Sequence, residues 1–389
     1  MEPGNRGGNM VFRRKCPVTR DKAGITFGER TVSGDSPETG RCLLQVDIRK
    51  RLRQFSLQVQ FQAGRGCLGI LGASGCGKSM TLKAIAGIED PDQGQVVLGG
   101  RVLYDSGAGI CLRPQKRKTG YLFQNYALFP NMTVEQNLEA GLRYGAGIRG
   151  DCSRQVKELA GRFRLEGLEQ QYPGRLSGGQ QQRAALARIF ACGPEVLLLD
   201  EPFSAMDSFL KEGLRLELKQ ILGAYEGVSV LVTHDRDEAY QLCDHLLLMK
   251  EGRVLVTGPT RQVFANPGTV EAARLTGCRN ISRIRRLGPH QVCALDWDGL
   301  VLSTKEPVGE HIQAIGIRAH DLNPLGEGEG QVNRIPVTGP KVTEMPFEWY
   351  VTLDNGIWWK TEKDIRTHEP AGFVPRWLYV DPSAILLLE

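Results

Sequence analysis

At 389 residues, the chain is longer than a single typical domain, so two or three domains are expected. Hydrophobic residues make up 41% and charged residues 24%, as in ordinary globular proteins, and no apolar run approaches the roughly 18 residues needed to span a bilayer. The excess of basic residues that gives the net charge of +5 lies near the N-terminus. Residues 1–53 hold 12 Lys and Arg against 6 Asp and Glu, a balance of +6. The near-neutral remainder argues against a nucleic-acid-binding core, which would show clustered basic residues.

The first 41 residues are rich in Gly, Arg and polar side chains without a sustained period, and we expect a poorly ordered leader there. A basic leader could contact anionic lipid or rRNA, but a solvated tail is the simpler interpretation. After residue 43, apolar residues alternate with polar ones at 44–48 and again at 55–61. This alternation predicts two strands of an antiparallel pair.

A glycine-rich segment, GASGCGKS, follows the apolar run 67–71 and precedes a helical pattern. It fits the G-x-x-x-x-G-K-[ST] pattern of loops that bind nucleotide phosphates, and a chance match is disfavoured by the strand before it and the helix after it. Glycines let successive backbone N–H groups point at a polyanion, and the helix directs its positive end to the same place. The expected nucleotide-binding residues are Gly72, Ser74, Gly75, Cys76, Gly77, Lys78, Ser79 and Met80.

Two side chains of this segment have specific expected roles. Lys78 would reach the terminal phosphates, and the Ser79 hydroxyl would bind Mg²⁺. Cys76 is one of ten cysteines, none of which form a C-x-x-C pair, so we expect reduced thiols and no metal site. The adjacent helix start could lower the pKa of the Cys76 thiol. We interpret Cys76 as a small loop residue and not as a nucleophile.

The middle of the chain is rich in helical patterns. Residues 133–164 begin with a capping pattern at Thr133 and Gln136. The sequence LSGGQ at 176–180 then opens a helix predicted over 181–191, which ends before Gly193. We expect a helical subdomain over about residues 125–190.

Two fully apolar runs, 196–199 and 228–232, predict strands buried on both faces. The first ends in Asp200 and Glu201 and the second in Thr233 and His234. Ligands of open α/β sheets bind at the edge where such strands end. A short apolar strand at 121–123 also ends in a polar residue, Gln124. The alternation of strands and helices predicts an α/β domain.

The C-terminal part has a different pattern. Helical periodicity fades after residue 278, and short strands with turn signals replace it, including a loop at 326–330. Asp354-Asn355-Gly356-Ile357 is typical of a hairpin turn. The sequence therefore predicts a separate all-β domain at 279–389, such as a small barrel or an OB-like fold.

Together these motifs resemble those of the ATP-binding subunits of ABC transporters, in the family's order, across about residues 43–265. The matching motifs are the phosphate loop, the 176–180 signature, the 196–201 Walker B strand, the Q-loop residue Gln124 and the switch residue His234. The resemblance implies an α/β P-loop ATPase domain at 42–278 with an inserted helical subdomain, followed by an all-β (OB/TOBE-like) domain. It also implies ATP and Mg²⁺ as cofactors.

The resemblance carries roles over to individual residues. Asp200 would hold Mg²⁺ together with Ser79 and Gln124, and Glu201 would polarise the attacking water. His234 would contact the γ-phosphate, and Gln124 would also sense a membrane partner. The family's D-loop would be Ser204-Ala205-Met206-Asp207. One departure is the aromatic on which adenine usually stacks: none occurs between 43 and 54.

The signature residues would act on a different copy of the protein. A serine followed by glycines at a helix start forms a second anion site, and one domain cannot easily direct two such sites at one γ-phosphate. In the family, two subunits pack head to tail, so that each signature closes the other's ATP site. The residues concerned are Ser177, Gly178, Gly179 and Gln180.

Other segments indicate the kind of transporter. Residues 127–134 resemble importer ATPases, 109–117 and 275–282 resemble molybdate-import ATPases, and 316–321 resemble a TOBE-type regulatory domain. The resemblance implies uptake of an oxyanion, molybdate or else tungstate or sulfate, by a dimer on a membrane permease at the cytoplasmic face. A solute-binding protein would be an indirect partner, and the C-terminal domain could bind an oxyanion.

Alternatives stay open at this point. One is the ATPase of a sugar, polyamine or iron importer. Another is a soluble ABC ATPase acting on DNA or ribosomes, although this chain has a single ATPase half with only 99 positions between Lys78 and Ser177. A P-loop small-molecule kinase does not account for LSGGQ.

Overall fold

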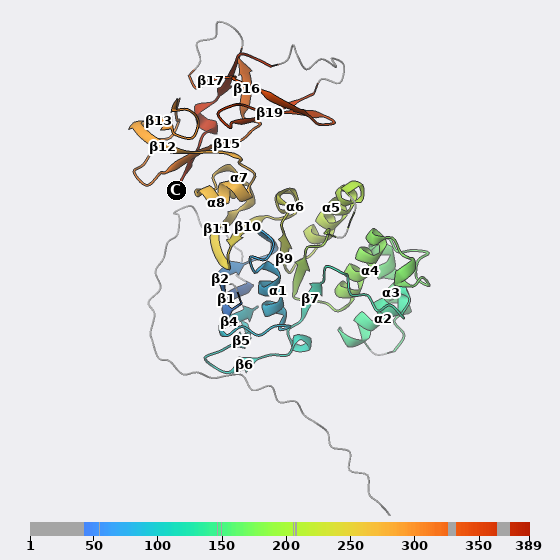
Figure 1. Ribbon diagram of the computed structural model, residues 1–389. Coiled ribbons are helices and arrows are strands. Elements are labelled where there is room, and N and C mark those ends of the chain that lie inside the picture. Colours follow the sequence, from blue (N-terminus) through green and yellow to red (C-terminus); the bar gives the residue numbers. More distant parts are fainter. Residues whose placement is uncertain are drawn as a thin grey trace, which may run out of the picture.

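The computed structural model describes residues 43–53, 55–145, 147–148, 150–204, 206, 208–325, 332–363 and 374–389. The expected leader and the loop predicted at 326–330 lie outside the described residues. Figure 1 shows an N-terminal unit of strands and helices, coloured blue to yellow, and a C-terminal unit of strands, coloured orange to red. The helices α7 (Thr260–Ala265) and α8 (Val270–Leu275) lie between the two units.

An eleven-stranded sheet forms the centre of the N-terminal unit, with the order β6-β5-β4-β1-β2-β11-β10-β3-β9-β8-β7. Parallel pairing joins β10, β3, β9, β8 and β7, whereas β6, β5, β4, β1 and β2 pair antiparallel. The parallel group is β3 (Gly66–Gly72), β7 (Thr119–Leu122), β8 (Val196–Asp200), β9 (Val228–Thr233) and β10 (His245–Lys250). The other strands are β1 (Leu44–Arg51), β2 (Ser56–Ala63), β4 (Gln93–Leu98), β5 (Arg101–Asp105), β6 (Ile110–Cys111) and β11 (Arg253–Pro259).

The strands that the sequence predicted are present. β1 and β2 pair antiparallel from Leu44↔Ala63 onward, and every residue of β8 and β9 is buried. The predicted strand at 121–124 is shifted, because β7 ends at Leu122 and Gln124 lies in the turn that follows. The sheet therefore places the ends of β3, β7, β8 and β9 at one edge.

Helices pack on this sheet and beside it. They are α1 (Lys78–Ala86), α2 (Val134–Tyr144), α3 (Ser153–Arg162), α4 (Gly178–Ala191), α5 (Ser208–Gly223) and α6 (Arg236–Leu242), with short 3₁₀ turns at Pro114–Lys116 and Pro173–Arg175. Contacts join α2 to α3 and α4, and Figure 1 shows these three helices as a group beside β7. Among the described residues, no helix is both long and apolar enough to cross a membrane.

Reciprocal capping begins two of these helices. At α2, Thr133 accepts a bond from the Gln136 N–H while the Gln136 side chain accepts from the Thr133 N–H, as the sequence predicted. Ser177 and Gln180 repeat this arrangement at α4. The cap starts α4 at Gly178, three residues earlier than predicted, because the capping serine lets both signature glycines join the first turn.

The C-terminal unit consists of strands apart from a 3₁₀ turn at Pro382–Ala384, within the residues described from 280 onward. Trp359 is fully buried in its core, and the indole N–H donates to the Leu322 carbonyl at 3.0 Å. The predicted hairpin turn at 354–357 joins two strands paired at Thr352↔Trp358. The fold class predicted from sequence, an α/β unit followed by an all-β unit, is confirmed.

Its strands form three sheets. The first contains β14 (Leu300–Ser303), β13 (Gln291–Ala294), β12 (Asn280–Gly288), β15 (Ala314–Ile317) and β22 (Leu386–Leu388). The second contains β16 (Leu322–Leu325), β21 (Trp377–Val380) and β17 (Arg334–Pro336). The third contains β18 (Lys341–Glu344), β19 (Glu348–Thr352) and β20 (Trp358–Glu362).

A fully buried arginine fixes the C-terminal end of α1. The Arg117 guanidinium donates to the carbonyls of Ala84 and Ile85 at 2.8 and 2.9 Å, and to Leu112 at 2.8 Å. A side chain at Gly87 would collide with it, because an added Cβ would lie 2.4 Å from Arg117 Nε. Burial lowers the pKa of Arg117 below its usual value. These bonds satisfy carbonyls that a helix end leaves free.

We predict that Arg117→Met lowers the free energy of unfolding by about 2–3 kcal/mol, because buried carbonyls would lose their donors. Arg113→Met is the matched control, since Arg113 is exposed four residues away. Urea denaturation of the full chain measures the difference. Equal midpoints for the two variants would contradict a structural role for Arg117.

Candidate functional site

The glycine-rich loop joins β3 to α1. Gly77 has φ 105°, in the left-handed region that favours glycine, and it is the N-cap residue of α1 without any side-chain cap. Gly72 passes so close to β10 that an added Cβ would lie 2.3 Å from the Met249 carbonyl oxygen. The first N–H groups of α1 are therefore not capped by a side chain within the described residues. Such a helix start is suited to bind an anion.

The Lys78 side chain folds back onto the first residues of this loop. Its ammonium group is buried and donates to the carbonyl oxygens of Gly72 at 2.9 Å and Ala73 at 3.0 Å. Phosphate oxygens are stronger acceptors for a charged donor than neutral carbonyls. The lysine is therefore held where a phosphate bound in the loop would meet it.

Asp200, at the end of β8, accepts a bond on each carboxylate oxygen. Ser79 donates to Oδ1 at 2.6 Å, and Tyr121 donates to Oδ2 at 2.8 Å. A hydroxyl and a carboxylate in contact are the hard oxygen ligands that Mg²⁺ takes, and Mg²⁺ usually adds phosphate and water ligands to only one or two protein groups. Ser79 and Asp200 therefore fit two of the three predicted magnesium ligands, whereas the third, Gln124, lies exposed in the turn after β7.

Tyr121 was not predicted as a site residue. Burial, together with the charge of Asp200, raises its pKa well above the usual value, so its hydroxyl stays protonated and acts as a donor. The tyrosine comes from β7, which pairs in parallel with β8 through Tyr121↔Leu198. Only the order of the strands brings it to Asp200, and no motif in the sequence marks it.

Glu201 and His234 lie together at the ends of two neighbouring strands. The Glu201 carboxylate is 3.3 Å from His234 Nδ1, and the Glu201 N–H donates to the Val232 carbonyl at 3.0 Å. Glu201 has φ 46°, which is strained for a residue with a side chain and is typical of functional positions. His234 is about half exposed, so it faces outward from the sheet edge. The sequence predicted both residues, and the β8–β9 pairing brings them together.

Gln124 and the signature residues lie elsewhere. Gln124 is exposed and makes no hydrogen bond to this cluster among the described residues. In the signature, Ser177 and Gly178 are exposed, whereas Gly179 is buried close to Leu214. Figure 1 shows α4 on the other side of β7 from α1. The fold of one chain therefore does not bring the signature to the phosphate loop.

Three further expectations concern residues near the loop. Burial raises the pKa of the Cys76 thiol, and this outweighs the charge of Lys78, so the expected lowering is wrong. Phe55, the first aromatic residue after the stretch 43–54, is half-buried, and its ring would be 3.5 Å from a Cβ added at Gly77. In the expected D-loop, Ala205 and Asp207 lie outside the described residues.

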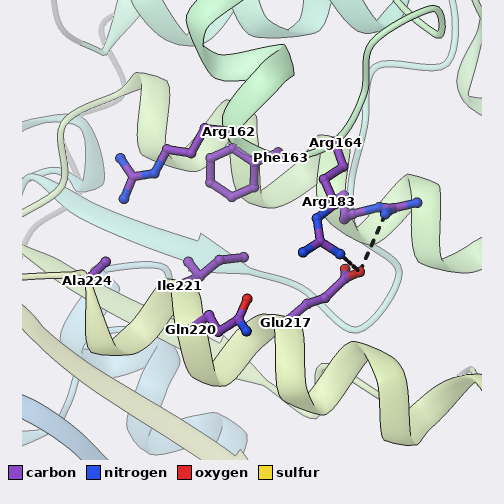
Figure 2. Close-up of a pocket in the computed structure, with 8 residues that line it drawn as sticks. All are labelled: Arg162, Phe163, Arg164, Arg183, Glu217, Gln220, Ile221 and Ala224. Atoms are coloured by element: carbon purple, nitrogen blue, oxygen red, sulfur yellow. Dashed lines mark hydrogen bonds and ion pairs between the residues drawn. The ribbon is translucent and has the colours of Figure 1, made fainter.

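A charged contact connects the signature helix to α5. Glu217 of α5 is 2.9 Å from Arg164 and 3.7 Å from Arg183 of α4. Figure 2 shows both arginines directed at this carboxylate, beside a small pocket of about 180 Å³ whose wall includes Phe163. Arg164 is mostly exposed, so the pair adds little stability. It links α4 to α5, the helix that follows the expected D-loop.

Comparisons with known proteins identify the family to which these motifs belong. The family described as ABC transporter matches residues 55–204. A spermidine/putrescine import ATP-binding protein, PotA of Oleidesulfovibrio alaskensis, is 36% identical over 67% of this chain and 71% of its own.

Two further relatives are similar. The sulfate/thiosulfate import ATP-binding protein CysA of Synechocystis is 34% identical over 70% of this chain and 74% of its own. The molybdate/tungstate import ATP-binding protein WtpC of Thermococcus kodakarensis is 35% identical over 79% of this chain and 94% of its own. The chain therefore belongs to the family of ABC transporter ATP-binding proteins, and it is an ATPase that uses ATP with Mg²⁺.

Proposed function

We propose that this ATPase powers the import of an oxyanion, molybdate first, with tungstate and sulfate as close alternatives. The observation that carries the proposal is the length of the match to the molybdate/tungstate import protein. It spans 79% of this chain and 94% of that protein, so it extends beyond the N-terminal unit into the all-β unit. The similarity to a polyamine import protein keeps polyamine uptake as the second candidate.

The geometry at the sheet edge supports the following catalytic roles. When bound, Mg²⁺ neutralises phosphate charge, and Ser79 and Asp200 would be its protein ligands. Tyr121 would hold the Asp200 carboxylate in one orientation. Glu201 would accept a proton from the attacking water, and His234 would fix the Glu201 carboxylate and contact the γ-phosphate. Gln124 would join this shell only after the turn that follows β7 moves inward.

A second copy of the chain would complete the site. The exposed helix start at Ser177 and Gly178 has the N–H groups and the positive helix end that bind anions. Because it lies away from the phosphate loop of its own chain, we infer that it closes the ATP site of another copy. Two copies related by a two-fold axis would then share two equivalent ATP sites.

A groove beside β7 is suited to a membrane permease. It has a volume of about 470 Å³ and lies among β7, α2 and α4. The Phe129 and Tyr144 side chains on it are 47% and 90% exposed, and the Arg188 guanidinium lies 4.9 Å from the Phe129 ring centre. Exposed aromatics that line a groove mark protein interaction sites. A cytoplasmic helix of the permease would dock there, with a solute-binding protein on the other side of the membrane.

We predict that Glu201→Gln lowers ATP hydrolysis by about 10²-fold or more, because the water loses its base. ATP binding should persist, and size-exclusion chromatography with ATP should show a stable dimer. Glu212→Gln, at an exposed position on α5, is the matched control and should keep wild-type turnover. Near-normal hydrolysis by Glu201→Gln would refute this role.

We predict that Tyr121→Phe raises the Mg²⁺ concentration for half-maximal ATPase rate about 10-fold, as loss of a bond to a metal ligand does elsewhere. The rate at saturating Mg²⁺ should change far less. Tyr126→Phe is the control, because the buried Tyr126 hydroxyl has no hydrogen-bond partner among the described residues. If both variants show the same Mg²⁺ dependence, Tyr121 does not position Asp200.

We predict that cells lacking this protein lose high-affinity molybdate uptake and keep sugar uptake. Parallel assays with tungstate, sulfate and spermidine identify the solute. Loss of spermidine uptake alone would replace the oxyanion proposal with the polyamine one. Co-purification with ribosomes instead of a membrane permease would refute a transport function altogether.

A further inference from the structure

A second pocket lies between the two units of the chain, far from the phosphate loop in sequence. It has a volume of about 440 Å³, within the range of small-molecule sites. Its walls come from α6, α7, the segment after α8, and the loop after β15. We call it the junction pocket, and its charged and aromatic lining residues are Arg236, Asp237, Tyr240, Arg261, Phe264, Arg318 and His320.

The charge of the junction pocket is unbalanced. Three arginines line it against one aspartate, Asp237, whose carboxylate is 3.8 Å from Arg236 Nε. Arg261 is exposed and has no ion-pair partner among the described residues. The nearby Asp321 carboxylate lies 3.6 Å from His320 Nε2 and also interacts electrostatically with Arg318, so three arginines face two aspartates. The pocket therefore retains an excess of guanidinium groups.

The arginines come from different elements and are held in place. The Arg318 guanidinium donates to the carbonyl oxygens of Thr276, at 2.8 Å, and of Phe264, which fixes the C-terminal unit to α7. Arg236 passes over Gly277, where an added Cβ would lie 2.0 Å from Arg236 Nη1. A glycine at φ 95° thus leaves space for this guanidinium. The positions of these two arginines are built into the fold.

We propose that the junction pocket binds a small ligand through a doubly charged oxyanion group. Guanidinium groups form paired hydrogen bonds to planar or tetrahedral oxyanions, and arginine is the residue best suited to that geometry. The pocket is larger than one oxyanion requires, and the edge-to-face pair Tyr240 and Phe264, with ring centres 4.9 Å apart, offers an apolar wall. Both a free inorganic oxyanion and a phosphorylated organic molecule share this chemistry.

A ligand in the junction pocket would contact α6, which begins close to the ATPase site. Arg236 begins α6, two residues after His234, and the intervening Asp235 caps that helix. Asp235 and Glu238 also pair with Arg215 of α5 at 2.5 and 3.2 Å. A ligand held between α6 and the C-terminal unit would therefore restrain the helix that begins two residues after His234. This proposal does not depend on the transported solute.

The test titrates the full chain by calorimetry with sulfate, molybdate, phosphate and ribose 5-phosphate. Saturating Mg²⁺ and a non-hydrolysable ATP analogue occupy the phosphate loop, and chloride at matched ionic strength controls for screening. We expect at least one probe to bind, and Arg261→Ala to weaken it at least 10-fold. The exposed arginine variant Arg285→Ala, outside the pocket, should bind as the wild type does.

The probes distinguish the sources of the ligand. Tighter binding of ribose 5-phosphate than of phosphate assigns the pocket to phosphorylated organic molecules, and the reverse assigns it to free oxyanions. Gly277→Ala, which displaces Arg236, should also weaken binding. Absence of binding by every probe, or equal binding by wild type and Arg261→Ala, overturns the proposal. Basal ATPase activity is measured alongside: if it is present without probe binding, only this inference fails.

Discussion

The site depends on the hydrogen bonds that the Asp200 carboxylate accepts from Ser79 and Tyr121. This carboxylate closes a fully buried strand, and its two oxygens join the helix after the phosphate loop, through Ser79, to the neighbouring strand, through Tyr121. A buried carboxylate is costly unless it accepts hydrogen bonds, and here both oxygens do. The same strand continues into Glu201, whose left-handed backbone places the next carboxylate beside His234. One strand end thus fixes the positions of the two carboxylates to which we assign the metal and the attacking water.

The buried strands, the sheet edge where they end and the helix starts could be predicted from sequence, because each is encoded by a short local pattern. Apolar runs that end in polar residues predict buried parallel strands, and parallel strands bring their ends to one edge. This pattern placed Glu201 and His234 at one sheet edge although 33 positions separate them, and the resemblance to the ABC family supplied their expected roles. Capping patterns likewise predicted where α2 begins, and the turn chemistry at Asn355-Gly356 predicted the hairpin of the C-terminal unit.

The rest depends on contacts between distant parts of the chain. The Tyr121 hydroxyl reaches Asp200 only because β7 is the neighbour of β8 in the sheet. No short sequence pattern predicts the order of strands in a sheet. Arg117 looks like one more surface charge, yet it is buried against the end of α1. The expected pKa of Cys76 was wrong because burial, a property of the whole fold, outweighs the adjacent helix start and lysine. The separation of the signature from the phosphate loop of its own chain likewise depends on where β7 lies between α1 and α4.

The reciprocal cap at Ser177 and Gln180 has a consequence for the kinetics of the proposed dimer. A loop that ordered only on contact would lose conformational entropy at the moment of association, at about 1–2 kcal/mol for each residue fixed. The cap already fixes this turn in the single chain, so the turn loses its conformational entropy during folding and not during association. Closure of two copies around ATP then resembles rigid-body docking. Its rate would be governed by diffusion and orientation, not by local folding of the signature.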